Sequence, residues 1–322
     1  MSQDNTYALV ADIGGTNTRV ALADSTIVRK DTIKRYQNAA YPGLADVLHT
    51  YLCEIGGAEP VATCVAVAGP VSNGTAAMTN FDWTMNLQTL RDATRAGTVD
   101  ILNDLQAQGH SVGYLSADML HPVLHGKPPA PHASSLVVNV GTGFNASPVF
   151  DTPGARVVPP SECGHVTLPT RTAEHERLSA YVGHEHGFPS VEDVLSGRGL
   201  VNVFRFVGSE MGTSGDLSAQ DIMSACAAGD EQARNTVRLC VEILGGVTGN
   251  LALTHLPFGG IYLVGGVARA FAPFLTDFGF GEAFRDKGRF ASFMDDFAVN
   301  VVTDDYAALT GCAAHMARTV AT

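Results

Sequence analysis

An aspartate followed by a glycine turn stands near the start of the chain. Residues 8–17 read ALVADIGGTN, so Asp12 comes at the end of an apolar run and is followed by Gly14, Gly15 and Thr16. Backbone N–H groups in such a turn can bind an anion, and glycine lets a phosphate approach without a Cβ clash. The spacing predicts a carboxylate beside a metal–phosphate complex. The alternative is a tight hairpin whose aspartate only stabilises its own turn.

Two further glycine turns follow apolar runs at 135–140 and 261–264. Their residues are Gly141, Thr142 and Gly143 in the first turn, and Gly265 and Gly266 in the second. Three such turns after three strands are difficult to explain by turn formation alone. They predict that two similar halves of the chain grip one nucleotide from two sides, which is the geometry that phosphoryl transfer needs.

An asparagine–aspartate pair, Asn103 and Asp104, follows the short strand expected at 99–102. Ligand residues of open α/β sheets lie at such strand ends. A carboxylate there could accept the proton of an alcohol as its oxygen attacks the γ-phosphorus of a nucleotide, and the neighbouring amide could bind a neutral hydroxyl. The alternative for an isolated pair is a cap on the helix that follows.

Two carboxylates and an imidazole form the third candidate group, which consists of Glu162, His165 and Glu192. Together they could bind vicinal hydroxyl groups bidentately, as a site that selects a polyol requires. A zinc site made of Cys163, His165 and a carboxylate is the alternative, but the sequence lacks the paired spacings typical of zinc sites. Glu192 by itself would suit a helix surface equally well.

The elements that must position these residues alternate between strands and helices. A helix at 41–55 precedes a buried strand at 61–68, and a third strand is expected near 32–36 after the first hairpin. Further helices are expected at 173–186, 190–207, 218–228, 232–256 and 306–320, with serine caps at Ser190 and Ser218. The pattern predicts an α/β protein with mixed sheets, and a proline-rich surface loop at 126–132.

The bulk composition of the 322-residue chain favours two folded domains. Its formal net charge of −12 argues against nucleic acid or an anionic membrane as a partner, since both need clustered Lys and Arg. Six cysteines are scattered singly, which indicates buried thiols in a reducing compartment. The sequence shows neither a basic-then-apolar leader nor an uninterrupted apolar run of membrane-spanning length, so a cytoplasmic protein is predicted.

Several segments, taken in order, resemble the bacterial-type glucokinases, in the sugar-kinase branch of the actin-like ATPase superfamily. They are residues 11–19, 78–83, 103–104, 141–143, 162–165, 194–202, 249–253, 259–266 and 284–290. A single motif of this kind would be weak evidence, whereas the ordered series covers almost the whole chain and is typical of that family.

The resemblance implies two actin-like (ribonuclease H-like) domains hinged over a cleft. The small domain would comprise residues 1–112 and 304–322, and the large domain residues 113–303. The implied reaction is transfer of a phosphoryl group from ATP to the 6-hydroxyl of glucose, with Asp104 as the general base. A homodimer is expected by analogy with the family.

The resemblance also implies a role for each candidate residue. The implied sugar-binding residues are Asn103, Asp104, Glu162, His165 and Glu192. The implied nucleotide-binding residues are Ala11, Asp12, Ile13, Gly14, Gly15, Thr16, Gly141, Thr142, Gly143, Gly265 and Gly266. Mg²⁺ would arrive with ATP and contact Asp12 through water, without a protein metal site.

The sequence departs from the family pattern at several positions. Ala11 stands where glycine is usual, Phe144 and Asn145 stand where leucine and glycine are usual, and Ser161 and Cys163 replace two glycines. Phe144 and Asn145 follow a predicted phosphate turn and lie near the expected sugar. They could therefore change affinity or sugar preference while leaving the reaction intact.

Other readings of the sequence remain open. Mannose, fructose or an N-acetylhexosamine could be a better substrate than glucose. A non-catalytic sugar sensor is disfavoured because Asp104 is present and no helix-turn-helix extension precedes Asp12. A chaperone or filament ATPase would need a large extension, for which this chain is short. The repressor and kinase (ROK) relatives carry a cysteine-rich zinc motif that does not follow His165 here.

Overall fold

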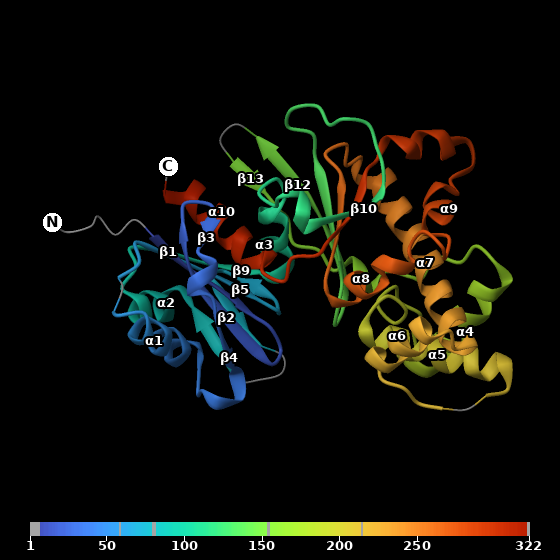
Figure 1. Ribbon diagram of the computed structural model, residues 1–322, viewed down its shortest axis with the longest axis horizontal. Helices are drawn as coiled ribbons and strands as arrows, with labels where there is room; N and C mark the ends of the chain where they lie inside the picture. The colour runs from blue at the N-terminus through green and yellow to red at the C-terminus, as the bar shows by residue number, and fades with distance from the viewer. Residues whose placement is uncertain (1–6, 58, 79–81, 153–154, 214, 321–322) are drawn as a thin grey trace. The chain divides into compact units, whose positions relative to one another are not determined.

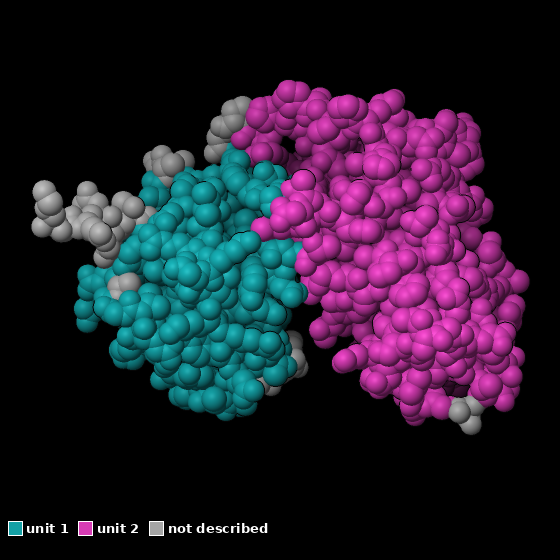
Figure 2. Space-filling model, in the orientation of Figure 1, with its two compact units in different colours: residues 1–116, 154–160, 304–322 teal, residues 117–153, 161–303 magenta. Residues whose placement is uncertain are grey.

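The computed structural model describes residues 7–57, 59–78, 82–152, 155–213 and 215–320 (Figure 1). Two compact units make up the chain. Unit 1 consists of residues 1–116, 154–160 and 304–322, and unit 2 of residues 117–153 and 161–303 (Figure 2). Each unit has a mixed sheet with helices packed against it, which confirms the predicted α/β class.

The sheet of unit 1 begins with the predicted hairpin. Its strands are β1 (Tyr7–Ile13), β2 (Asn17–Asp24), β3 (Ile27–Val28), β4 (Lys34–Gln37), β5 (Ala62–Val67) and β9 (Thr98–Asn103). They run in the order β3-β2-β1-β5-β9, and β4 also pairs with β2. Strands β1, β5 and β9 are parallel, with Ile13 opposite Val67 and Val67 opposite Asn103. The two candidate aspartates, Asp12 and Asp104, therefore lie at the same edge of this sheet.

Helices cover both faces of this sheet. They are α1 (Leu44–Glu54), α2 (Leu87–Thr94), α3 (Asp104–Ser111) and α10 (Ala307–Val320). Because side chains alternate along a strand, Leu9 and Ile13 of β1 pack in the core with α1, and Val10 packs in the core with α10. The expected helices at 41–55 and 306–320 are thus confirmed.

A small antiparallel sheet follows β5 in unit 1. It contains β6 (Val71–Ser72), β7 (Thr75–Ala77) and β8 (Thr84–Asn86). Of the glucokinase-like segment 78–83, residues 79–81 lie outside the described residues.

Strand β13 (Ala155–Val157) lies in the segment 154–160. Arg156 of this strand donates a hydrogen bond to the carbonyl oxygen of His110 in α3, at 3.0 Å.

The sheet of unit 2 contains the second hairpin and the third glycine turn. Its strands are β10 (Leu120–Leu124), β11 (Ser135–Val140), β12 (Phe144–Thr152), β14 (Ile261–Val264) and β15 (Val299–Val302). They run in the order β10-β15-β14-β11-β12. Strands β11 and β12 are antiparallel, whereas β11, β14 and β15 are parallel. Parallel pairing brings the turn after β14 beside the turn after β11.

The helices of unit 2 pack around α7, which is largely buried. They are α4 (Ala173–His186), α5 (Gly197–Met211), α6 (Ala219–Ala228), α7 (Glu231–His255), α8 (Gly266–Phe271) and α9 (Phe280–Arg285). Among the described residues, α7 is long and apolar enough to cross a membrane by length and composition only. Two thirds of its most apolar window is buried inside the protein (67%), so its packing accounts for that composition.

The predicted start of one helix is wrong. Ser190 was expected to cap a helix at 190–207, but α5 begins at Gly197 and is capped by Ser196, whose hydroxyl accepts a bond from the Gly199 N–H at 2.9 Å. Ser190 instead bonds Asp193 within a separate turn, at 2.5 Å. The same side-chain pattern serves an isolated turn and a helix start, so spacing alone cannot separate them. Ser218 does cap α6 as predicted.

Candidate active site

The glycine turn after β1 is held by Asn38, a fully buried residue that begins a short 3₁₀ helix, η2 (Asn38–Ala40). Its Nδ2 donates to the Gly14 carbonyl at 2.8 Å, and its Oδ1 accepts from the Thr18 hydroxyl at 2.8 Å. Its backbone N–H donates to the Thr16 carbonyl at 2.9 Å. These bonds use carbonyl oxygens of the turn, and Gly15 and Thr16 stay exposed to solvent. No sequence pattern pointed to Asn38, which lies 24 positions after Gly14.

Asp12 forms an ion pair with Arg19 on the facing strand, with 3.1 Å between Oδ2 and Nη1. Burial raises the pKa of the Asp12 carboxyl, and the Arg19 charge partly offsets that effect. The predicted neighbours Ala11 and Ile13 have fully buried side chains in the unit 1 core. Only backbone atoms of these two residues could therefore reach a nucleotide.

Asn103 caps α3, as the alternative interpretation of the pair predicted. Its Oδ1 accepts from the Leu105 N–H at 2.9 Å, and its backbone N–H donates to Gln106 Oε1 at 3.1 Å. Its Nδ2 donates to the Gly69 carbonyl at 2.9 Å. The cap fixes the backbone at the start of α3 and so orients the next residue, Asp104.

Asp104 is the first residue of α3, and its Oδ1 accepts from the Leu105 N–H at 2.8 Å. Burial raises the pKa of the Asp104 carboxyl to about 6, the backbone hydrogen bond opposes this, and the nearby charge of Asp12 raises it further. A carboxylate with this pKa is ionised at neutral pH and is still basic enough to accept a proton.

The two glycine turns of unit 2 touch each other. A Cβ atom on Gly265, whose φ is +100°, would lie 2.5 Å from the Val140 carbonyl oxygen and 2.6 Å from Asn139 Oδ1. A Cβ on Gly141 would lie 3.9 Å from the Gly265 Cα. Within the first turn, the Gly141 N–H bonds the Gly143 carbonyl at 2.9 Å. Residues 141–143 and 265–266 therefore form one backbone-lined surface.

Glu192 joins this surface to the loop that carries Glu162 and His165. Its Oε2 accepts from the Phe144 N–H at 2.9 Å, next to the glycine turn. A Cβ on Gly143 would lie 2.5 Å from that same oxygen. The backbone N–H of Glu192 donates to the Gly164 carbonyl at 2.9 Å. The carboxylate is mostly shielded, with 20% of its side chain exposed.

Glu162 and His165 are exposed and close to each other. Their side chains are 78% and 64% exposed, and 4.0 Å separates Glu162 Oε2 from His165 Nε2. Glu162 precedes a short 3₁₀ helix, η4 (Cys163–His165), and His165 is its last residue. In the part of the chain that the structure describes, no group of three His, Cys, Asp or Glu residues could hold a metal ion.

Three of the residues that depart from the family pattern contact one another. Asn145 Nδ2 donates to the Ser161 carbonyl oxygen. Asn145 Oδ1 accepts from the Cys163 N–H at 3.3 Å and from its Sγ at 3.6 Å. The side chain of Asn145 therefore holds the loop that presents Glu162.

The fold and these turns define the chain as an α/β protein of the class that contains the glucokinases and ROK sugar kinases. The chain belongs to the glucokinase family, because a family model described as Glucokinase matches residues 9–319. This confirms the resemblance found in the sequence.

Individual relatives agree with this assignment. A glucokinase of Cronobacter sakazakii is 35% identical over 320 residues, which is 98% of each chain. The crystal structure of a glucokinase from an Antarctic psychrotroph superposes with a TM-score of 0.86 and 28% identity, over 96% of this chain and 98% of that one. A ROK family glucokinase from Streptomyces griseus, in complex with glucose and AMPPNP, has a TM-score of 0.64 and 19% identity, over 97% of this chain and 99% of that one. At that identity the last match shows the fold alone.

Proposed function

We propose that this protein transfers the γ-phosphoryl group of ATP to the 6-hydroxyl of glucose, giving glucose 6-phosphate and ADP. The observation that carries the proposal is Asp104, a half-buried carboxylate at a helix start whose pKa is raised to about 6. As the general base, Asp104 accepts the proton of the 6-hydroxyl while that oxygen attacks the γ-phosphorus. Membership of the glucokinase family supports this reaction.

The sugar hydroxyls are proposed to bind Asn103, Glu162, His165 and Glu192. The Phe144 N–H fixes one oxygen of the Glu192 carboxylate. The exposed pair Glu162 and His165 is free to approach a ligand from solvent. Carboxylates that accept two hydroxyl hydrogens at once distinguish a polyol from water.

The phosphates of ATP are proposed to contact the glycine turns at 14–16 and 141–143, and the adenosine to lie near 265–266. At Gly265 the backbone lies too close to the Val140 carbonyl oxygen for a Cβ, so this turn offers main-chain groups to a ligand. Mg²⁺ bound to ATP would neutralise charge that develops on the phosphoryl oxygens. Asp12 would hold a water of that ion, balanced by Arg19.

The proposed domains are residues 1–112 with 304–322, and residues 113–303, hinged so that glucose binding closes them. Closure would exclude water, which otherwise competes with the sugar as phosphoryl acceptor. We also propose a homodimer in the cytoplasm, for which gel filtration with light scattering is the direct measurement.

A coupled ADP-release assay tests the proposed reaction. Purified protein with ATP and Mg²⁺ is expected to release ADP with glucose and to show a lower kcat/KM with mannose, fructose and N-acetylglucosamine. A clear preference for one of these sugars would move the assignment to that hexose. Failure with every simple sugar would contradict the kinase proposal itself.

Glu192→Gln is expected to raise KM for glucose by about 10- to 100-fold, because a charge-assisted hydrogen bond contributes about 1.5–3 kcal/mol. The amide keeps the shape of the side chain and still offers an oxygen to the Phe144 N–H, so the fold is retained. Steady-state kinetics over a wide glucose range measure the effect. An unchanged glucose affinity would remove Glu192 from the sugar site.

Asn145→Ala is expected to raise KM for glucose by about 3- to 10-fold, because the loop at 161–163 loses the hydrogen bonds that order it. Turnover at saturating glucose should stay within about twofold of wild type, since no reacting atom is touched. Ser218→Ala, which removes a helix cap elsewhere in unit 2, is the matched control. A control that shifts KM equally would show a general loss of stability.

A further inference from the structure

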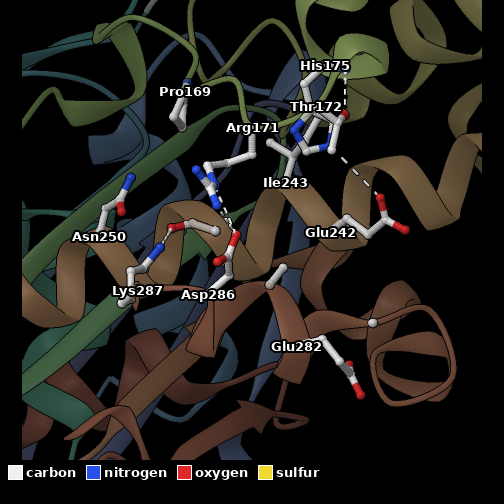
Figure 3. Close-up of a pocket in the computed structure, with 13 residues that line it drawn as sticks. Pro169, Arg171, Thr172, His175, Glu242, Ile243, Asn250, Glu282, Asp286 and Lys287 are labelled. Atoms are coloured by element: carbon white, nitrogen blue, oxygen red, sulfur yellow. Dashed lines mark hydrogen bonds and ion pairs between the residues drawn. The ribbon is translucent and has the colours of Figure 1, made fainter. Parts of the chain in front are cut away.

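A separate cavity of about 540 Å³ lies in unit 2 (Figure 3). It is lined by the start of α4, one face of α7, and α9 with the residues that follow it. None of the lining residues belongs to the candidate active site. The cavity lies instead where two of the glucokinase-like segments that the proposed function leaves unused, 249–253 and 284–290, come together.

Gly246 of α7 forms part of the cavity wall, and packing does not require a glycine there. A Cβ on its neighbours Gly245 and Gly249 would lie 2.4 Å from the Phe280 carbonyl oxygen and 2.6 Å from the Phe284 carbonyl oxygen, so both allow α9 to approach α7. A Cβ on Gly246 would have no atom within 4 Å. Glycine inside a helix costs about 0.5–1 kcal/mol relative to alanine. What Gly246 provides is open space.

Two cations face this space. Lys287 Nζ donates to the Gly246 carbonyl at 3.1 Å, which leaves further ammonium hydrogens for a ligand. Arg171 extends toward the same side of the cavity (Figure 3). Burial lowers the pKa of Lys287, the charge of Asp286 opposes this, and the charge of Arg171 lowers it further. An anion between Arg171 and Lys287 would relieve their repulsion.

The acidic residues of the lining are already engaged or point elsewhere. Asp286 Oδ2 pairs with Arg171 Nη2 at 2.8 Å, and Glu242 Oε1 pairs with Arg238 at 2.8 Å. The Glu282 side chain is directed away from Arg171 and Lys287 (Figure 3). These acidic residues therefore leave Lys287 able to bind an acceptor group of a ligand.

His175 supplies an independent indication of a ligand. Its side chain is 8% exposed and lines the cavity, and neither ring nitrogen has a hydrogen-bond partner among the described residues. Its Nε2 lies 3.9 Å from Glu242 Oε2, beyond hydrogen-bond distance. A buried imidazole without a hydrogen-bond partner carries a desolvation cost that a ligand hydroxyl or carboxyl group would recover.

We propose that this cavity is a second binding site, which takes a small organic anion. Its carboxylate or phosphate group binds Lys287 and Arg171, and its remaining polar atoms reach His175. The apolar part of the molecule packs over Gly246 and Ile243. This site stands independently of the proposed phosphoryl transfer, because it shares no residue with it.

Calorimetric titration of the full chain with citrate, 3-phosphoglycerate and inorganic phosphate tests the proposal, with glycerol as a neutral probe. Glucose and AMPPNP are present throughout, so that the active site does not contribute. At least one anion is expected to bind, and glycerol is not. Gly246→Val, which fills the cavity, and Lys287→Met are each expected to weaken that binding at least tenfold.

Two variants control for folding and for net charge. Gly246→Ala should keep the fold and equal or exceed the wild-type Tm, because nothing packs on that position. Lys127→Met removes a lysine charge of unit 2 outside the cavity and should leave binding unchanged. The proposal is overturned if no anion binds, if Gly246→Val and Lys287→Met both bind as wild type does, or if Lys127→Met weakens binding as much as Lys287→Met.

Discussion

Asp104→Asn is expected to lower kcat by about two to four orders of magnitude while glucose binding stays within a fewfold of wild type. Asparagine keeps the size of the side chain and can still accept from the Leu105 N–H, so the start of α3 is retained. It cannot accept the proton of the 6-hydroxyl. Turnover by the coupled assay and glucose affinity by calorimetry measure the two quantities separately. Near-normal turnover would show that another group is the base.

The stability of the same variant separates loss of chemistry from loss of fold. The folded-state pKa of Asp104 is about 6, above its ordinary value of 3.8, because burial disfavours the charged form. Between these pH values the folded state binds more protons than the unfolded state, so the free energy of unfolding falls as pH rises. Asparagine carries no charge, so it avoids the cost of holding an ionised carboxylate at this position. At pH 8, Asp104→Asn should therefore have a Tm equal to or above that of wild type.

The pH dependence of wild-type kcat/KM should follow the same carboxyl group. Protonation of Asp104 removes the base, so kcat/KM is expected to fall about tenfold per pH unit below pH of about 6. The plateau above that pH should be flat until another group titrates. A profile that stays level down to pH 4.5 would assign proton transfer to a different group, and a buffer series at constant ionic strength controls for screening.

The sequence was sufficient for features encoded by neighbouring residues. The continuous apolar run of β1, followed by Gly14 and Gly15, predicts a hairpin because both signals lie next to each other in the sequence. The same holds for β11 with Gly141, and for Asp104 at the end of β9. Local patterns thus predicted the strands, the turns and the location of the proposed base.

The sequence was insufficient for side chains whose partners come from elsewhere in the chain. Asn38 supports a turn that precedes it by more than 20 positions, and Asn145 reaches Ser161 across a strand and a loop. Neither contact follows from periodicity, because the spacing of apolar residues does not show which distant group an asparagine side chain meets. The cavity beside Gly246 has the same origin, since its empty space depends on how α4, α7 and α9 pack together.

Gly311→Ala is expected to destabilise the protein by about 2–4 kcal/mol, the upper end of overpacking effects, because the added methyl group meets backbone that cannot move alone. A Cβ on Gly311 of α10 would lie 1.7 Å from the Ala107 carbonyl oxygen of α3 and 3.1 Å from the Ser111 N–H nitrogen. Glycine is what lets these two helices touch. Differential scanning calorimetry should show a Tm lower by roughly 5 °C or more.

The matched control for this change is Gly246→Ala, which adds the same methyl group to a helix where nothing lies within 4 Å. The two substitutions gain the same helix propensity, so the difference in Tm between them reports the contact with α3 alone. Because α3 begins at Asp104, separating α10 from α3 should also lower kcat at temperatures below Tm. If Gly311→Ala matched the control in both Tm and kcat, packing of α10 would have no part in holding the base.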